Sequence, residues 1–209
     1  MRYICLAMPL LLLLALLRHK PQPTYIDTPV HIDTVFTFPE QSIIENIDYM
    51  AHINYMRKHI GVPTKDTINL WLSSVGLPPG NPFCSAALSH SLDVAGVTSP
   101  SVRSGLAMNF VFQTDKSIQI DPNDVYKQIK TVPAGSIVVY RRGDTRFGHN
   151  GFLIDSMTGN RGVYISANTS APGSSGSESA GGGVYEKDFS INPYSYFRVN
   201  KFVLVSYEN

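Results

Sequence analysis

The hydrophobic pattern changes near the middle of the chain, and this change constrains the fold more than any other feature. Before about residue 130, apolar residues recur at three- and four-residue steps, which is the spacing of amphipathic helices. Beyond that point, short apolar or alternating runs are separated by turn residues, which predicts β-strands. Helices followed by an antiparallel sheet make an α+β fold.

Two helices are expected early in the chain. The first covers Ser42 to Ile60, where isoleucine and methionine lie on one face, and Gly61 ends the pattern. The second covers Asp66 to Val75, and Gly76 follows it as a stop signal.

A third helix is predicted to begin at Asn81-Pro82-Phe83-Cys84 and to end at Gly96. Asparagine as the N-cap, proline at the first helical position and glycine after the last turn form a full start-and-stop signature. A short helix is also expected near Asp121 to Ile129.

The strands are predicted from the second half of the chain. The expected ranges are Ser136 to Tyr140, Gly151 to Ile154, Val163 to Ser166 and Phe202 to Ser206. Between Ala171 and Gly183 glycine and serine dominate, which predicts a mobile surface loop.

Length and charge limit the possible functions. A chain of 209 residues fits one catalytic module with an N-terminal extension, and 43% hydrophobic residues suffice for a core. The formal net charge of +1, without a basic stripe, argues against a nucleic-acid partner.

The N-terminus predicts export. An apolar stretch from Tyr3 to Leu17 lies between Arg2 and the basic residues 18–20. Pro9 and a length below the ~20 residues of a spanning helix favour a signal peptide. The absence of a small-x-small cleavage site after Leu17 favours a retained anchor in the inner membrane. We therefore expect a signal peptide or anchor in residues 1–20, a linker in residues 21–41 and the folded domain in residues 42–209, in a periplasmic or cell-envelope protein.

Cys84 is the candidate nucleophile. Cys5 lies in the N-terminal apolar stretch, which is either held in the membrane or removed. Cys84 is therefore the single cysteine of the exported part and a candidate reactive thiol. The first turn of a helix offers unpaired N–H groups and a positive dipole end, which lower a cysteine pKa when a basic partner assists. The alternative is a small buried apolar side chain.

His149 is the candidate base. Its segment, Gly148 to Gly151, forms a glycine-flanked turn that leads into the apolar run 152–154, and a strand held by the core is a rigid support for a general base. The other histidines have structural explanations: His52 and His59 share a helix, and His90 lies about two turns below Cys84. The alternative for His149 is a turn histidine without a catalytic role.

Two residues are candidates for orienting the imidazole. Ser166 and Asn168 project to one side of a strand by period-two alternation, so either could reach a histidine on an adjacent strand. The sequence contains no metal-ligand, phosphate-loop or dinucleotide motif, and we expect no metal or cofactor. Arg141, Arg142 and Arg146 either grip acidic groups of a substrate or merely solvate a hairpin, and we favour the hairpin role.

Four segments resemble motifs of the CHAP-domain amidases and peptidases, relatives of the NlpC-type cell-wall peptidases. The segments are 74–87 around Cys84, 133–140, 148–151 around His149, and 168–170 together with 182–185. Their order and spacing agree with the family, and the resemblance runs from about Ile43 to Val205.

The resemblance implies a papain-like fold and a peptidoglycan hydrolase that forms a thioester at Cys84. It implies that His149 activates the cysteine and that Ser166 or Asn168 orients the histidine. Relatives commonly carry a glutamate where this chain has Ser166, and a serine hydroxyl brings no charge to stabilise imidazolium.

The bond cut is either the muramoyl–alanine amide or one within the stem peptide or cross-bridge. The rivals are a weak or inactive peptidoglycan-binding module and a secreted antibacterial effector. We expect a monomer that contacts peptidoglycan, no nucleic acid, and a membrane only through its N-terminal segment.

Overall fold

The computed structural model describes residues 50–174, 181–195 and 197–207, and the expectations for residues 1–20 and 21–41 lie outside these ranges. The described chain forms one antiparallel sheet in the order β1-β6-β2-β3-β4-β5, and its helices precede β2 in the sequence. The α+β prediction is confirmed. Among the described residues, no helix is long and apolar enough to cross a membrane.

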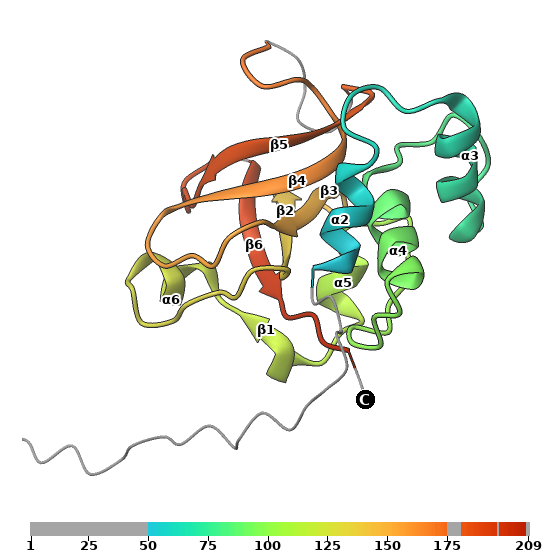
Figure 1. Cartoon of the computed structure of the whole chain (residues 1–209). Helices are drawn as coiled ribbons and strands as arrows, with labels where there is room; N and C mark the ends of the chain where they lie inside the picture. The colour runs from blue at the N-terminus through green and yellow to red at the C-terminus, as the bar shows by residue number, and fades with distance from the viewer. Residues whose placement is uncertain (1–49, 175–180, 196, 208–209) are drawn as a thin grey trace, which may run out of the picture. The chain divides into compact units, whose positions relative to one another are not determined.

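Helices occupy most of the first part of the described chain (Figure 1). They are α2 (Ala51–Arg57), α3 (Lys65–Ser74), α4 (Cys84–Val94), α5 (Asn109–Phe112), the 3-10 helix η1 (Lys116–Ile118) and α6 (Pro122–Tyr126). Thr64 caps α3, since its Oγ1 accepts a hydrogen bond from the Thr67 N–H at 3.2 Å. Gly76 and Gly96 follow α3 and α4 with φ of 71° and 67°, the left-handed conformation expected after a helix.

One helical expectation was wrong in part, and one short helix was not predicted. The helix expected to reach Ile129 ends at Tyr126, because Gln128 takes a left-handed φ of 61° and turns the chain. The short helix α5 was not predicted, since four residues carry too little periodic pattern to be recognised.

The strands are β1 (Gln119–Ile120), β2 (Ile137–Arg142), β3 (Gly148–Leu153), β4 (Arg161–Thr169), β5 (Gly183–Ser190) and β6 (Phe197–Val203). The strand predicted at Phe202 to Ser206 begins earlier and ends at Val203. Strand β5 was missed because it lies at the sheet edge, where charged residues 186–188 replace a clear apolar alternation.

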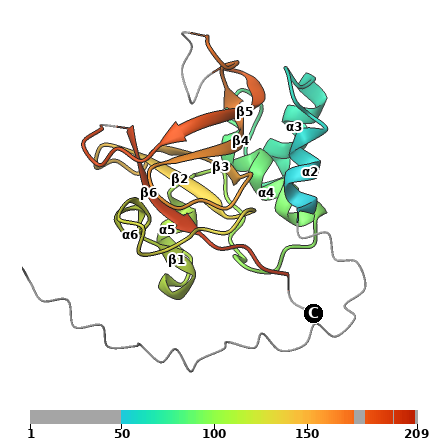
Figure 2. The same ribbon diagram turned by 60° about the vertical axis from the view of Figure 1, so that its left-hand side comes forward.

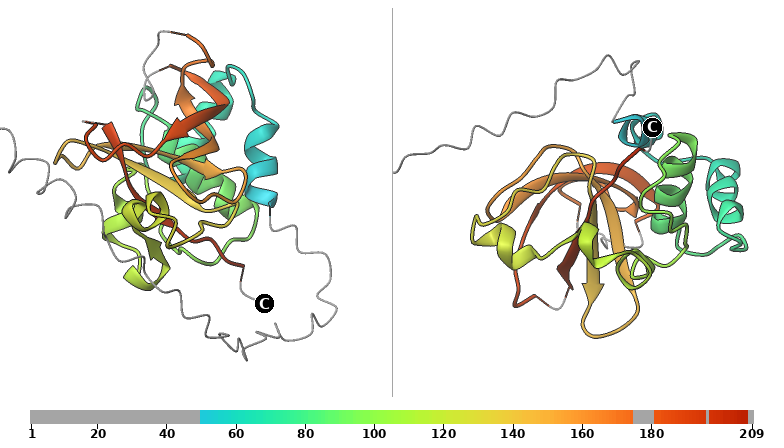
Figure 3. Two further views of the ribbon diagram at one scale, coloured as in Figure 1. Left: turned by 90° about the vertical axis from the view of Figure 1, so that its left-hand side faces the viewer. Right: turned by 90° about the horizontal axis from the view of Figure 1, so that it is seen from below.

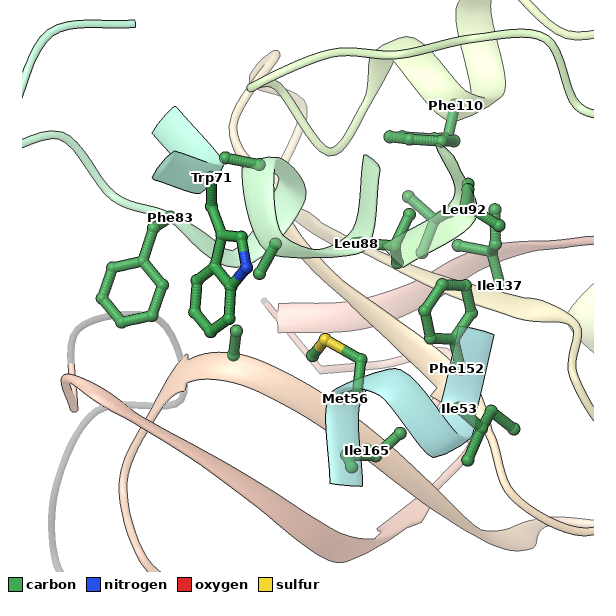
Figure 4. Close-up of a cluster of buried hydrophobic side chains, with 14 of the residues drawn as sticks. Ile53, Met56, Trp71, Phe83, Leu88, Leu92, Phe110, Ile137, Phe152 and Ile165 are labelled. Atoms are coloured by element: carbon green, nitrogen blue, oxygen red, sulfur yellow. The ribbon is translucent and has the colours of Figure 1, made fainter. Parts of the chain in front are cut away.

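The sheet packs its two faces against different partners. Helices α2, α3 and α4 gather at one side of the sheet, while α6 lies away from them (Figures 1 and 2). The helix side holds the larger core, which includes Trp71, Leu88, Leu92, Phe152 and Ile165 (Figure 4). The opposite face of the sheet carries a second core, which includes Tyr140, Leu153, Tyr164 and Phe202. The right-hand view of Figure 3 shows the teal and green helices gathered beside the curved sheet.

Small side chains let α4 approach the sheet closely. Ala86 and Ala87 are fully buried in the first turn and a half of the helix, and α4 contacts both β3 and β4. Close packing in this region fixes the start of α4 against β3, since well-packed interiors leave little room for a helix to slide.

His52 is fully buried and connects α2 to the rest of the domain. Its Nε2 bonds the Gly135 carbonyl oxygen at 3.0 Å, and its Nδ1 bonds the Tyr207 hydroxyl at 2.7 Å. Because a carbonyl oxygen only accepts, Nε2 donates to Gly135, and Nδ1 is left to bond the Tyr207 hydroxyl.

Removal of the Tyr207 hydroxyl tests this tie. We expect Tyr207→Phe to lower the free energy of unfolding by about 1 kcal/mol, because the buried Nδ1 of His52 loses its hydroxyl partner. Urea denaturation followed by circular dichroism measures the loss. Tyr126→Phe, at a half-exposed position, is the matched control. Equal midpoints for the two variants would show that the His52–Tyr207 bond contributes nothing.

Candidate active site

Cys84 is the first residue of α4, and the start of the helix is built differently from the prediction. Phe83 is the N-cap and makes no side-chain cap bond. The predicted cap, Asn81, instead donates from Nδ2 to the Pro78 carbonyl oxygen at 2.9 Å and closes the preceding turn. Pro82 therefore lies before the helix. The N–H groups of the first turn are not capped by the side chain of Phe83.

The thiol of Cys84 is buried and surrounded by hydrogen-bond donors. Cys84 is 6% exposed, and its Sγ lies 3.9 Å from the hydroxyl oxygen of Ser85. Burial raises the pKa of the Cys84 thiol, while hydrogen bonds with the Ser85 hydroxyl and with the backbone of Ser85, Asn150 and Cys84 act in the opposite direction. The resting thiol is therefore protonated, which differs from the acidic thiol expected at a helix start.

Ser85 and Asn150 join the helix to β3, and sequence reasoning missed both. The Ser85 hydroxyl donates to Asn150 Oδ1 at 3.3 Å. The Asn150 side chain is fully buried, and its Nδ2 has no hydrogen-bond partner among the described residues. An unsatisfied buried donor is costly and is often retained for a functional reason. Phe152 belongs to the core on the helix side of the sheet, and residues two positions apart in a strand share a face. Alternation along the strand could therefore have predicted that Asn150 faces α4.

His149 lies within β3 and not in a turn, which corrects the prediction. It pairs with Tyr140 of β2, and the side chain is fully buried. Its Nε2 and the Ser166 hydroxyl are hydrogen-bonded at 3.0 Å. The ring packs edge-on against Tyr164 at 6.3 Å and lies 6.4 Å from Phe197.

The thiol and the imidazole approach β3 from different directions. Asn150 faces α4, so alternation turns His149 to the face that carries Tyr140 and Tyr164. Strands β3 and β4 pair at Phe152–Ile165 and Leu153–Tyr164, beyond the His149–Asn150 end of β3. Here the Asn150 N–H serves Cys84 instead of a ladder bond. The structure thus brings the thiol to the strand of His149, and the imidazole to Ser166.

The two orienting candidates do not occupy equivalent positions. A register shift between Ala167 and Thr169 interrupts the alternation, and Asn168 takes a left-handed φ of 57°. Ser166 meets the imidazole, whereas Asn168 lines a second pocket of about 520 Å³ together with Lys65 and Phe83. The prediction that both residues project to the same side fails at this bulge.

A pocket of about 400 Å³ opens beside Cys84. It is lined by Leu77, Asn81, Pro82, Cys84, Gly105, Leu106, Ala107, Arg142, Arg146, Phe147, Gly148 and Phe197. One wall thus carries the thiol, and another is the hairpin that joins β2 to β3. His149 is not a lining residue, but its neighbours Gly148 and Phe197 are, so the ring lies directly behind this wall.

No group of three or more histidine, cysteine or acidic side chains that could hold a metal ion occurs within the described ranges. The remaining histidines lie elsewhere: His59 and His90 flank Tyr55 at ring distances of 5.0 and 5.6 Å, and burial lowers the pKa of both. Comparisons with protein-family models, with curated proteins and with solved structures gave no match for this chain.

The raised pKa of Cys84 gives a direct prediction for its alkylation. In a Cys5→Ser background Cys84 is the single thiol, and we expect its rate with iodoacetamide to rise with pH at a higher midpoint than that of glutathione. Ser85→Ala should move the midpoint further up, because the thiolate loses the Ser85 hydroxyl, whose single hydrogen can turn from Asn150 Oδ1 to an ionised sulfur. A midpoint below that of glutathione would mean that donors outweigh burial at this sulfur.

Proposed function

We propose that this protein is an exported cysteine hydrolase with a papain-like arrangement, and that it cuts amide bonds in peptidoglycan. The single observation that carries the proposal is the position of Cys84. Its sulfur lies at the start of α4, on the wall of a pocket, and against the backbone of the residue that follows His149. A thiol, an imidazole and a hydroxyl that holds the imidazole are the parts that acyl transfer needs.

In the proposed reaction the imidazole takes the thiol proton and the thiolate attacks the amide carbonyl. If Nε2–H donates to Ser166, the lone pair lies on Nδ1, which is the nitrogen that accepts the proton. The tetrahedral oxyanion is stabilised by N–H groups of the first turn of α4 and by the Asn150 amide. Imidazolium then protonates the departing amine, leaving a thioester that water hydrolyses.

Burial makes this proton transfer necessary. Because the pKa of Cys84 is raised, little thiolate exists at neutral pH without the imidazole. Proton transfer also requires the His149 imidazole to reach Sγ of Cys84 past Asn150. At this part of β3 no residue pairs with β4. Ser166 holds the ring without adding charge, so imidazolium is stabilised less than it would be by a carboxylate.

Peptidoglycan as the substrate rests on the resemblance of the four sequence motifs and on the export segment. Both the muramoyl–alanine amide and amides within the stem peptide or cross-bridge fit the chemistry. A secreted antibacterial effector would use the same reaction on the walls of other cells.

One observation favours a second candidate, a module that binds peptidoglycan without cutting it. The thiol is buried with a raised pKa, and the imidazole has an uncharged hydroxyl in place of a carboxylate. Such a module would bind purified walls as well after Cys84→Ala as before it, and would release no fragments in either form.

Replacement of the nucleophile tests the hydrolase proposal. We expect purified cell walls to release peptide fragments with the wild-type chain and none above background with Cys84→Ala, because no thioester can form. Mass spectrometry of the fragments identifies the bond. The chelator EDTA should leave the rate unchanged, since no step uses a metal. Unchanged release by a folded Cys84→Ala variant would remove the proposal.

The contributions of the imidazole and of its hydroxyl partner should differ in size. We expect His149→Ala to lower kcat by about 10²- to 10⁴-fold, the usual contribution of a general base. Ser166→Ala should lower it by about 10-fold, since it removes one hydrogen bond to the ring. Initial rates on cell walls measure both effects, with thermal denaturation as the check on folding. A larger loss for Ser166→Ala than for His149→Ala would contradict the assigned roles.

A further inference from the structure

The hairpin between β2 and β3 carries three arginines, and the structure gives them different roles. The guanidinium of Arg141 donates to the carbonyl oxygens of Thr145 at 3.0 Å and Asp144 at 2.7 Å. Arg141 therefore holds the hairpin itself, in agreement with the sequence prediction for this residue.

Arg142 and Arg146 do not share that role. Both side chains line the pocket that contains Cys84, and both residues are exposed. Neither guanidinium forms an ion pair or hydrogen bond in the part of the chain that the structure describes. Asp144, the acidic residue of the hairpin, pairs with Arg198 at 3.4 Å. Two positive charges therefore face the pocket without a protein counter-charge.

Apart from Asn81 and Cys84, the rest of the pocket is lined by apolar residues and glycine, which strengthens the effect of these charges. Phe147 and Leu106 are 55% and 37% exposed and both line the pocket. The Arg146 guanidinium lies 5.4 Å from the centre of the Phe147 ring, a cation–π contact that limits its motion. No aspartate or glutamate is among the lining residues.

We propose that Arg142 and Arg146 form a subsite for a free carboxylate, so that the preferred substrates are amides with a carboxylate near the bond that is cut. The substrate part of this inference rests on the proposed hydrolase function; the anion subsite itself does not. A planar guanidinium presents paired N–H donors that match a carboxylate, and the exposed apolar side chains accept the adjacent part of the ligand. Arg142 and Arg146 act as specificity residues, and Cys84 remains the reacting group.

Alkylation of Cys84 tests the subsite without any substrate. Iodoacetate and iodoacetamide are nearly equal in size, and both lose iodide as the thiolate sulfur forms a bond to their CH₂ carbon, but only iodoacetate carries a carboxylate. In the Cys5→Ser background, we expect the ratio of the iodoacetate rate to the iodoacetamide rate to fall about 3-fold for Arg142→Gln or Arg146→Gln. The double variant should lower it by about 10-fold, as expected for charges several ångströms away in a wet pocket.

Arg161→Gln is the matched control, because it removes the same charge from a surface site at the start of β4 that does not line this pocket. It should leave the ratio unchanged, and added salt should lower the ratio of the wild-type pocket more than that of the double variant. A double variant with the same ratio as Arg161→Gln would overturn the subsite. So would a Cys84 that reacts with neither reagent, since the pocket would then not lead to the sulfur.

The substrate part is tested with soluble wall fragments, native or with their carboxylates converted to carboxamides. We expect wild type to prefer native fragments in kcat/KM, and the double variant to lose about 10-fold of that preference. Equal preference in both chains would overturn the substrate part. Absence of hydrolysis together with a normal alkylation ratio would reject the proposed hydrolase and leave the anion subsite standing.

Discussion

The contact between the start of α4 and the backbone of β3 determines how the rest of the candidate site is arranged. Burial of Ala86 and Ala87 allows the helix to approach the sheet, and this approach places Cys84 Sγ against the Asn150 N–H. The Ser85 hydroxyl bonds the Asn150 side chain and holds the same junction from the neighbouring position. The pocket beside Cys84 exists because the loop ahead of the helix and the β2–β3 hairpin extend past this junction.

The same contact creates opposing effects on the thiol. Close packing removes water from Sγ and raises the pKa of Cys84, while the donors that the packing supplies would stabilise a thiolate. Because burial is the larger effect, the Cys84 thiol ionises less readily than a free cysteine, and a base that accepts its proton would matter more at this sulfur than at an exposed one.

The sequence predicted the main features of the site and not its details. Cys84 at a helix start, His149 near a buried strand and Ser166 on the next strand all follow from local patterns. The cap was misassigned because Asn81 makes its bond within the preceding turn. The bulge at Asn168 has no signal in the alternation, so the choice between Ser166 and Asn168 could not be made. The bond between Ser85 and Asn150 joins residues 65 positions apart, and a local sequence pattern cannot predict such a contact.

The hairpin arginines show the same limit of sequence reasoning, and the register of the strands resolves it. Arg141 and Arg142 are adjacent in a strand, so their side chains leave opposite faces of the sheet. The sequence does not show which of the two arginines turns to the hairpin backbone and which turns to the pocket. The register of β2 with β6 decides this, because it pairs Arg142 with Phe197. Phe197 stacks on Tyr140 at 5.1 Å and also neighbours His149. Arg142 is therefore fixed to the element that covers the imidazole, and a ligand held by its guanidinium would contact the wall that separates His149 from the pocket.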